Sequence, residues 1–307
     1  MMKKKILVIQ GSNLKKVNVK TDTTLFLALE AQKRNFQIYY YEPKDLSFLD
    51  GRVIAKCISL TFYEGRNLFY KTKKKLDIDL SKANILLIRN EPPFDQQYIN
   101  STFILEHIEK KIKIINHPKS IREVPEKLFS IRLSKYMPST LISQNLEEIN
   151  KFFKKNKKII LKPIEGYSGN EVVLLKKFNK KIVNRYLKKY NHIIFQKFLP
   201  KIKNGDRRVF IINGKVKGSI TRVPKQGSIL SNMSKGAVAK INKLTIKELK
   251  ISREVASLLI KKNIYFAGID FVQGKLIGDI NVTSPTGLVT YYNLTGINLA
   301  KYFWDNI

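Results

Sequence analysis

The sequence has little cysteine and histidine, and its opening stretch has no long apolar run. Its 307 residues include one cysteine, Cys57, and three histidines. A single cysteine excludes an internal disulfide and suits a reducing compartment. None of the histidines stands in a context typical of a nucleophile and base pair. The opening stretch MMKKKILVIQGSN has only about five apolar residues before Gln10, too few for a signal-peptide core or a membrane span. We therefore expect a cytoplasmic protein with no membrane partner.

Acidic residues are also scarce, with 24 Asp and Glu against 58 Lys and Arg, a formal net charge of +34. Such a charge suggests a nucleic-acid partner, and a non-catalytic nucleic-acid-binding protein is therefore one hypothesis. The lysines, however, are scattered over the whole chain together with many Ile and Asn residues, form no single stripe and accompany no known nucleic-acid module. We interpret the charge as mainly compositional and do not expect a nucleic-acid partner, although such a field attracts anionic substrates.

The first third of the chain alternates apolar strand-like runs with helical patterns. Strands are predicted at 6–11, 37–43, 84–90 and 113–118, and helices at 21–35 and 98–111. The stretch FLDGRV (48–53) predicts a hairpin turn between them. Alternating strands and helices favour an α/β fold with a parallel, doubly wound sheet.

After about residue 120 the pattern changes to hairpins and mixed elements. Strands are predicted at 159–164, 171–177 and 192–199, hairpins at 207–223 and 267–282, and helices at 181–190, 245–263 and the chain end. The first hairpin turns on Asn213-Gly214. This part is antiparallel in character, so the whole chain is predicted to be α/β with an α+β second part. The boundary is expected near Pro118 to Pro125.

Three polar residues lie on the second of these hairpins. Asp270 follows an apolar strand, and Asp279 and Asn281 lie on the returning strand. Residues two apart on a strand share one face and lie about 7 Å apart. Oxygen ligands of this kind favour Mg²⁺, which completes its shell with water and substrate phosphates. The alternative is an ordinary surface hairpin with a polar face, and the motif alone does not decide between them.

A second candidate is a lysine followed by a glycine-bearing loop. Lys162 ends an apolar strand, and Gly166, Ser168 and Gly169 follow in EGYSGNE. Glycines let backbone N–H groups approach a phosphate. A lysine at a strand end is also a common surface charge, so this signal is weak by itself. Lys127 and the segment 196–199 carry no signal in isolation.

The order and spacing of these motifs resemble those of one family, the bacterial glutathione synthetases of the ATP-grasp superfamily. The resemblance runs almost from end to end. It is carried by KTDTTLFLALEAQKRNF (20–36), LIRNEPPFDQQYINSTFILE (87–106), INHPKSIREVPEKLF (115–129), IILKPIEGYSG (159–169), FQKFLPKIKNGDRRVFIINGK (195–215), AGIDFV (267–272) and DINVTSPTG (279–287). RNEPPFD and INVTSPT are specific to this family rather than to ATP-grasp proteins in general.

The resemblance implies three domains or subdomains and a role for each site residue. The parts are an N-terminal substrate domain (1–122) and an ATP-grasp domain (123–307), which divides into a small lid subdomain (123–200) and a C-terminal catalytic subdomain (201–307). Expected ATP contacts are Lys127, Lys162, Gly166, Ser168, Gly169, Gln196, Lys197, Phe198, Leu199 and Asp206. Expected ligands of Mg²⁺, or Mn²⁺, are Asp270, Asp279 and Asn281. Expected binders of the peptide and glycine carboxylates are Arg89, Arg207 or Arg208, Arg222, Asn281, Ser284, Pro285 and Thr286. Arg207, Arg208 and Arg222 are also expected to be catalytic.

The implied reaction joins γ-glutamylcysteine to glycine while ATP is cleaved to ADP and phosphate. The γ-phosphate activates the cysteinyl carboxylate as an acylphosphate, which the glycine amine attacks. Such chemistry depends on positioning and electrostatics and needs no nucleophilic Ser, Cys or His. The family's tendency also implies a homo-oligomer.

The sequence departs from the family pattern at several places. Asp279 stands where Glu is usual, and the loop after Lys162 has fewer glycines. A mobile loop is expected at 223–240, with Ala237 and Val238 in place of Gly and Arg. The segment after Gly287 is shorter and lacks the usual basic and acidic residues. A related ligase that uses another amine or γ-glutamyl peptide is therefore an alternative.

Overall fold

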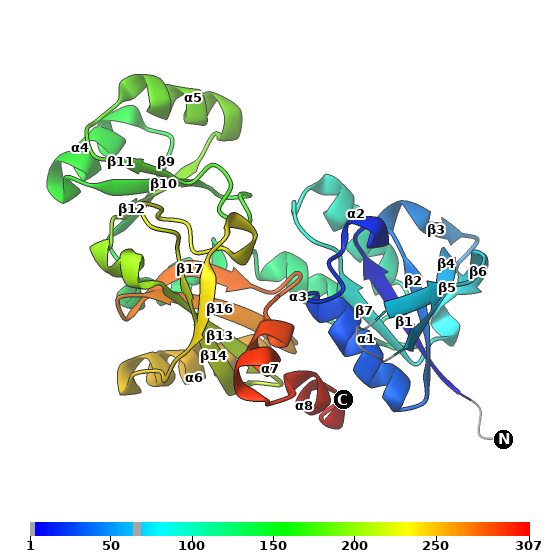
Figure 1. Cartoon of the computed structure of the whole chain (residues 1–307). Coiled ribbons are helices and arrows are strands. Elements are labelled where there is room, and N and C mark those ends of the chain that lie inside the picture. Colours follow the sequence, from blue (N-terminus) through cyan, green and yellow to red (C-terminus); the bar gives the residue numbers. More distant parts are fainter. Residues whose placement is uncertain (1–3, 64–68) are drawn as a thin grey trace.

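The computed structural model describes residues 4–63 and 69–307 as three sheets with their helices (Figure 1). The N-terminal sheet has the strand order β3-β4-β2-β1-β7-β8, with β5 and β6 also paired to β4. Its strands are β1 (Lys5–Gly11), β2 (Phe36–Tyr41), β3 (Leu46–Leu49), β4 (Arg52–Tyr63), β5 (Phe69–Thr72), β6 (Leu76–Asp79), β7 (Ile85–Arg89) and β8 (Lys113–Ile115). The four strands β2, β1, β7 and β8 run parallel, which confirms the predicted α/β class.

Successive residues of β1 face opposite sides of this sheet, as the period of two requires. Leu7 and Ile9 pack on the side of α1 (Thr23–Lys33), whereas Val8 packs on the side of α2 (Gln96–Glu106) and α3 (Pro118–Glu123). Both faces are covered, so the strand is a continuous apolar run. The carboxyl ends of β1 and β7 are left pointing toward the rest of the chain.

The predicted turn at 48–53 is confirmed, because β3 and β4 pair in an antiparallel hairpin. The length of β4 and its pairing with β5 and β6 were not predicted. Val53, Ala55 and Cys57 are buried at every second position of β4, but the intervening positions include the apolar residues Ile54 and Ile58, so the sequence shows no clear alternation.

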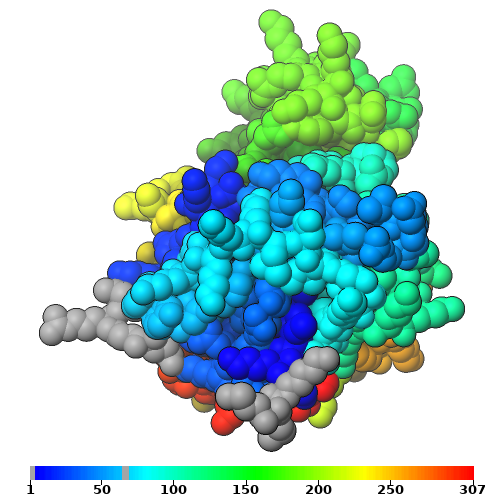
Figure 2. All heavy atoms as spheres, turned by 90° about the vertical axis from the view of Figure 1, so that its right-hand side faces the viewer, coloured from blue at the N-terminus to red at the C-terminus, as the bar shows by residue number. Residues whose placement is uncertain are grey.

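The second sheet has four antiparallel strands in the order β11-β10-β12-β9. They are β9 (Thr140–Ser143), β10 (Ile159–Pro163), β11 (Val173–Leu175) and β12 (Ile193–Lys197). Helices α4 (Leu146–Asn156) and α5 (Lys180–Tyr190) cover one face and enclose a small core around Ile149, Leu161 and Phe195. This unit projects from the rest of the molecule, as the green part of Figures 1 and 2 shows.

The third sheet has five antiparallel strands in the order β15-β14-β13-β16-β17. They are β13 (Asp206–Ile212), β14 (Lys215–Val223), β15 (Val238–Ile241), β16 (Phe266–Val272) and β17 (Lys275–Asn281). The two predicted hairpins, β13–β14 and β16–β17, are confirmed. The loop expected at 223–240 is shorter than predicted, because its last residues pair with β14 as strand β15.

Helix α6 (Ile246–Lys261) covers one face of this sheet, and the chain ends in α7 (Leu288–Thr295) and α8 (Leu299–Asp305). Thr245 and Glu248 form a capping box that fixes where α6 begins. Phe303 and Trp304 of α8 join one buried cluster with Leu7 and Leu25 of the N-terminal part. The first and last parts of the chain therefore share a core, and the second sheet stands apart.

Candidate active site

A cavity of about 790 Å³ lies where the three sheets meet. It is lined by residues from the carboxyl ends of β1 and β7, from β10 and its following loop, from β12, and from one face of the third sheet. Its volume is in the range of pockets that hold ligands of nucleotide size. The residues predicted for the site can be placed against this cavity.

All but three of the predicted site residues line the cavity. Those that line it are Lys127, Lys162, Gly166, Ser168, Gly169, Gln196, Lys197, Phe198, Leu199, Asp206, Arg208, Arg222, Asp270, Asp279, Asn281, Ser284 and Thr286. Arg89, Arg207 and Pro285 are not among the lining residues.

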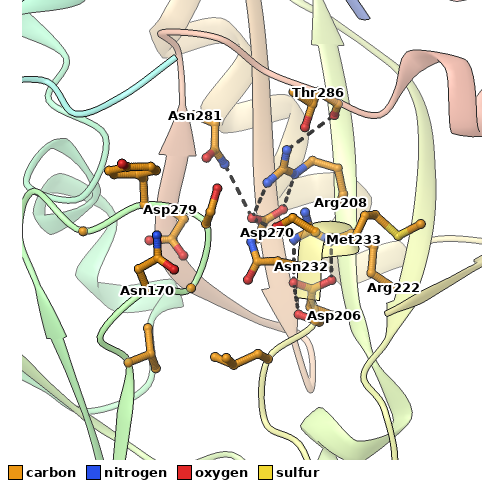
Figure 3. Close-up of a pocket in the computed structure, with 18 of the residues that line it drawn as sticks. Asn170, Asp206, Arg208, Arg222, Asn232, Met233, Asp270, Asp279, Asn281 and Thr286 are labelled. Carbon is orange, nitrogen blue, oxygen red and sulfur yellow. Dashed lines mark hydrogen bonds and ion pairs between the residues drawn. The ribbon is translucent and has the colours of Figure 1, made fainter. Parts of the chain in front are cut away.

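One wall, which we call the arginine–aspartate wall, consists of Asp206, Arg208, Arg222 and Asp270. Arg222 lies directly across the strand pair from Asp206, and Arg208 lies across from Asp270. The Arg222 guanidinium donates to both oxygens of Asp206, from Nε at 2.8 Å and from Nη2 at 2.6 Å. Arg208 donates to Asp270 in the same forked way, with Nη2 at 2.8 Å from Oδ2. Figure 3 shows the two pairs side by side.

The two pairs are also joined to one another. Arg222 Nη2 lies 3.1 Å from Asp270 Oδ2, and Ser231 donates its hydroxyl to Asp206 at 2.5 Å. Burial disfavours the charged form of Asp270, but Arg208 and Arg222 outweigh it and lower the pKa of this carboxyl to about 2. For Asp206 burial dominates, and its pKa is raised despite Arg222. The positive charges of this wall are therefore balanced by its own carboxylates.

The opposite wall, which we call the lysine wall, consists of Lys127, Lys162 and the loop 165–170. Lys162 is 6% exposed and donates to the Ile277 carbonyl at 2.7 Å, with Asp279 Oδ1 3.5 Å away. Lys127 donates to the carbonyls of Ile164, at 3.2 Å, and Gly166. Burial lowers the pKa of Lys162, and Asp279 partly offsets this effect. Main-chain carbonyls rather than forked carboxylates hold these two ammonium groups.

The predicted oxygen ligands meet between the two walls. Asn281 donates from Nδ2 to the Gly268 carbonyl at 3.1 Å and lies 3.5 Å from Asp270 Oδ2, and the Asp279 side chain is 27% exposed toward the cavity. Across residues 4–63 and 69–307 no group of three or more His, Cys, Asp and Glu is placed to hold a metal ion.

Arg207 does not take part in this arrangement. Side chains alternate along β13, so Asp206 and Arg208 face the cavity while Arg207 faces α6. There it donates to the buried carboxylate of Glu248. The prediction left Arg207 and Arg208 open for the carboxylate role, and the strand alternation favours Arg208.

Arg89 lies behind the cavity rather than on its surface. Its Nε donates to Thr24 Oγ1 at 3.1 Å and its Nη2 to the Pro285 carbonyl at 2.8 Å, while Ser284 donates its hydroxyl to the Arg89 carbonyl at 3.1 Å. Nη1 is buried without a partner among the described residues. Arg89 therefore connects β7 to the Ser-Pro-Thr turn, and the turn lies against the N-terminal sheet.

Sequence reasoning missed two parts of the cavity. The first is the polar loop after β1, including Ser12, Asn13, Lys16 and Asp22. A signal existed, because ligands of open parallel sheets bind at the carboxyl ends of the strands. The second is Glu126, which stands beside Lys127 and whose pKa is raised by burial, with hydrogen bonds from Thr283 opposing the shift. Nothing in its local sequence distinguishes it from a surface acid.

The three-sheet architecture, with a cavity between the lysine wall and the arginine–aspartate wall, is that of the ATP-grasp fold. Solved structures agree on the fold. The D-cycloserine synthetase DcsG superposes with a TM-score of 0.68 at 11% identity over 98% of this chain and 97% of the other, and the ATP-grasp ligase PsnB with a TM-score of 0.62 at 13% identity over 99% and 97%.

Family models and sequence relatives are more specific. Residues 5–122 match the prokaryotic glutathione synthetase N-terminal domain, and residues 126–296 match the prokaryotic glutathione synthetase ATP-grasp domain. The glutathione synthetase of Bradyrhizobium diazoefficiens is 35% identical over 97% of this chain and 96% of its own length. That of Buchnera aphidicola subsp. Schizaphis graminum is 36% identical over 95% and 94%. The chain belongs to the prokaryotic glutathione synthetase family and is an ATP-dependent ligase.

Proposed function

We propose that this enzyme joins γ-glutamylcysteine to glycine with cleavage of ATP, and that the cavity between the lysine wall and the arginine–aspartate wall is where it does so. The observation that carries this proposal is the pairing of two lysines that lack forked carboxylate partners with two arginines that have them, on opposite sides of one cavity. The lysine wall suits phosphate groups, and the arginine–aspartate wall keeps its guanidinium groups in a fixed geometry.

Lys127 and Lys162 are proposed to contact the ATP phosphates, because their ammonium groups face the cavity beside the glycine-bearing loop. Gly166, Ser168 and Gly169 would bring backbone N–H groups to the same phosphates. Gln196 to Leu199, at the end of β12 and just beyond it, would line the adenine, and Asp206 would lie near the ribose.

A divalent cation, Mg²⁺ or Mn²⁺, would be held by Asp270, Asp279 and Asn281. The donor set fits, because it is made of oxygens only and Asp279 is open to the cavity. When bound, such a cation supplies neutralisation of phosphate charge during transfer. Asp279 is one methylene shorter than the Glu usual in the family, so we propose that its reach is shorter without loss of the donor type.

The peptide carboxylate is proposed to lie near Arg208, Arg222 and the turn Ser284-Pro285-Thr286. Forked guanidinium groups whose carboxylate partners hold them rigidly can orient an acylphosphate without moving during the reaction. Arg89, which lies outside the cavity, would hold the Pro285 carbonyl and so fix the position of the turn. The glycine amine would attack the activated carboxyl carbon of the peptide. Most of the acceleration would come from positioning and electrostatics.

The proposal is tested with purified protein, ATP, Mg²⁺, γ-glutamylcysteine and glycine. We expect tripeptide and phosphate in equal amounts, and little phosphate when either the peptide or glycine is omitted. Replacing glycine by β-alanine, alanine or serine tests the alternative of another amine, which the shortened segment after Gly287 motivates. Turnover with one of these amines but not with glycine would contradict the proposal.

The division of the chain into 1–122, 123–200 and 201–307 also remains our proposal, and the separate sheets support it. Val124, Phe129, Leu133 and Met137 pack in the core of the third sheet. We therefore propose that the lid subdomain begins after Met137 rather than at residue 123. A homo-oligomer and a cytoplasmic location are likewise proposals. No helix among the described residues is long and apolar enough to cross a membrane.

A further inference from the structure

Glu126 holds the end of the strand on which two of the proposed metal ligands lie. Strand β17 is at the edge of the third sheet, so alternate N–H groups point away from β16 and need other partners. The main-chain carbonyl of Glu126 accepts from Ile280 N at 3.1 Å. Its side-chain Oε1 accepts from Val282 N at 3.2 Å, two residues further along the same edge.

The same carboxylate oxygen holds the next residue as well. Thr283 donates to Glu126 Oε1 from its main-chain N at 3.3 Å and from its hydroxyl at 2.7 Å. The Val282 carbonyl accepts from Asn116 Nδ2 at 2.6 Å, so both main-chain polar groups of Val282 are held by side chains. Ordinary strand pairing holds neither of them, because the β17 ladder ends at Asn281.

The hydrogen bonds to Glu126 hold the chain between two parts of the proposed active site. Asn281 precedes Val282, and the turn that begins at Ser284 follows Thr283. Three donors converge on one oxygen, so the path of the chain between the proposed metal ligand and the proposed substrate turn depends on Glu126. Its neighbour Lys127 reaches the loop after β10 instead, at the carbonyls of Ile164 and Gly166.

We propose that Glu126 is a positioning residue for ligation, which fixes residues 282 and 283 by hydrogen-bond acceptance and thereby places Asn281 and Ser284. This inference rests on the proposed function for its kinetic consequence only. The negative charge is not required for the role, because a glutamine Oε1 accepts the same bonds. Removal of the acceptor frees the strand end, whereas the adenine segment 196–199 lies on other strands and is unaffected.

The test compares Glu126→Ala with Glu126→Gln, and uses Glu123→Ala as the matched control. Glu123 is an exposed acid three residues earlier that pairs with Lys262 at the surface. In the ligand-free protein we expect hydrogen exchange at Val282 and Thr283 to be about tenfold faster or more in Glu126→Ala, near wild type in Glu126→Gln, and unchanged in Glu123→Ala. With substrates, kcat should fall about tenfold or more in Glu126→Ala while the KM for ATP stays within about twofold.

A second variant keeps the proposal testable if Glu126→Ala folds poorly. Thr283→Val removes only the hydroxyl donor and should give a smaller fall in kcat with the same unchanged KM for ATP. The proposal would be overturned if Glu126→Ala showed the hydrogen exchange and the kcat of the wild type. It would also be overturned if Glu126→Gln were as impaired as Glu126→Ala. If the wild type made no tripeptide, the proposed function would fail, but the exchange comparison would still decide the role of Glu126 in holding the strand.

Discussion

The two walls of the cavity carry the same kind of positive groups in opposite electrostatic settings. Arg208 and Arg222 each have carboxylate partners in forked geometry, so that wall is nearly neutral. Lys127 and Lys162 are held mainly by main-chain carbonyls, and the Asp279 carboxylate meets Lys162 only through a single contact at 3.5 Å. A buried charge without a counter-ion is costly to the fold, whereas a buried ion pair is costly mainly when one partner is removed. We infer from this difference that the lysine wall suits an anionic ligand, whereas the arginine–aspartate wall is rigid.

The largest effect on activity should come from Lys162→Met. The methionine keeps the apolar stem in its buried position and removes only the ammonium. We expect kcat/KM to fall on the order of 10²- to 10³-fold, because a preorganised charge aimed at the phosphates is lost. Steady-state tripeptide formation measures this fall in kcat/KM.

The control for this change is Lys158→Met. Lys158 lies just before β10 and is exposed, so its substitution removes a positive charge without touching the cavity. Its kcat/KM should stay within about twofold of wild type. Equal losses in both variants would indicate that the enzyme responds to overall charge rather than to the lysine wall.

Asp270→Asn should have the largest effect on stability. The substitution leaves Arg208 without its forked partner and Arg222 with one carboxylate instead of two, in a buried setting. Breaking a buried ion pair in this way typically costs about 3–5 kcal/mol of unfolding free energy. Urea unfolding measures it, with Asp279→Asn as the comparison. Asp279 is partly exposed and is not in a forked pair, so its change should affect activity more than stability.

The stability of the protein at acid pH tests the role of Asp270 further. The pKa of Asp270 in the folded protein is about 2, below its ordinary value of 3.8. A lowered carboxyl pKa stabilises the fold at pH values above the ordinary pKa, and this stability is lost as the pH falls from about 4 toward 2. Wild type should lose on the order of 2 kcal/mol in this window that Asp270→Asn does not lose. Parallel stability curves for the two proteins between pH 4 and 2 would contradict the assignment.

A moderate effect is expected where the lysine wall touches the loop after β14. Gly169 has φ of +69°, and a Cβ at this position would lie 2.5 Å from Asn232 Oδ1. Gly169→Ala therefore adds both backbone strain and a clash across the cavity, and we expect the KM for ATP to rise about fivefold or more. Gly227, at φ +79°, has open space around it and provides a control with strain alone. A similar rise in Gly227→Ala would assign the effect to backbone strain and not to the contact between loops.

The residues of both walls could be predicted from the sequence, but several contacts that hold the site together could not. Lys162, Asp270 and Asp279 were found because strand periodicity and the family resemblance point to them, and the structure brings them to one cavity. What could not be predicted depends on contacts distant in sequence. Glu126 meets Thr283 across 157 positions, and Arg89 meets Pro285 across 196. Local patterns hold no information about such pairs, and the shared core of α8 and the N-terminal sheet was missed for the same reason.

The smallest effect on activity is expected for Arg207→Ala, and it tests the choice between two adjacent arginines. Arg207 faces α6, where Glu248 keeps its capping-box partners at Thr245 even when the guanidinium is gone. We expect kcat within about twofold of wild type but a stability loss of about 3 kcal/mol, because the buried Glu248 carboxylate loses its ion-pair partner. Arg208→Lys keeps the charge but loses the forked geometry, so its kcat should fall about tenfold or more. Because a shift of one residue along a strand exchanges its two faces, the opposite ranking of these variants would mean that Arg207 rather than Arg208 faces the substrate.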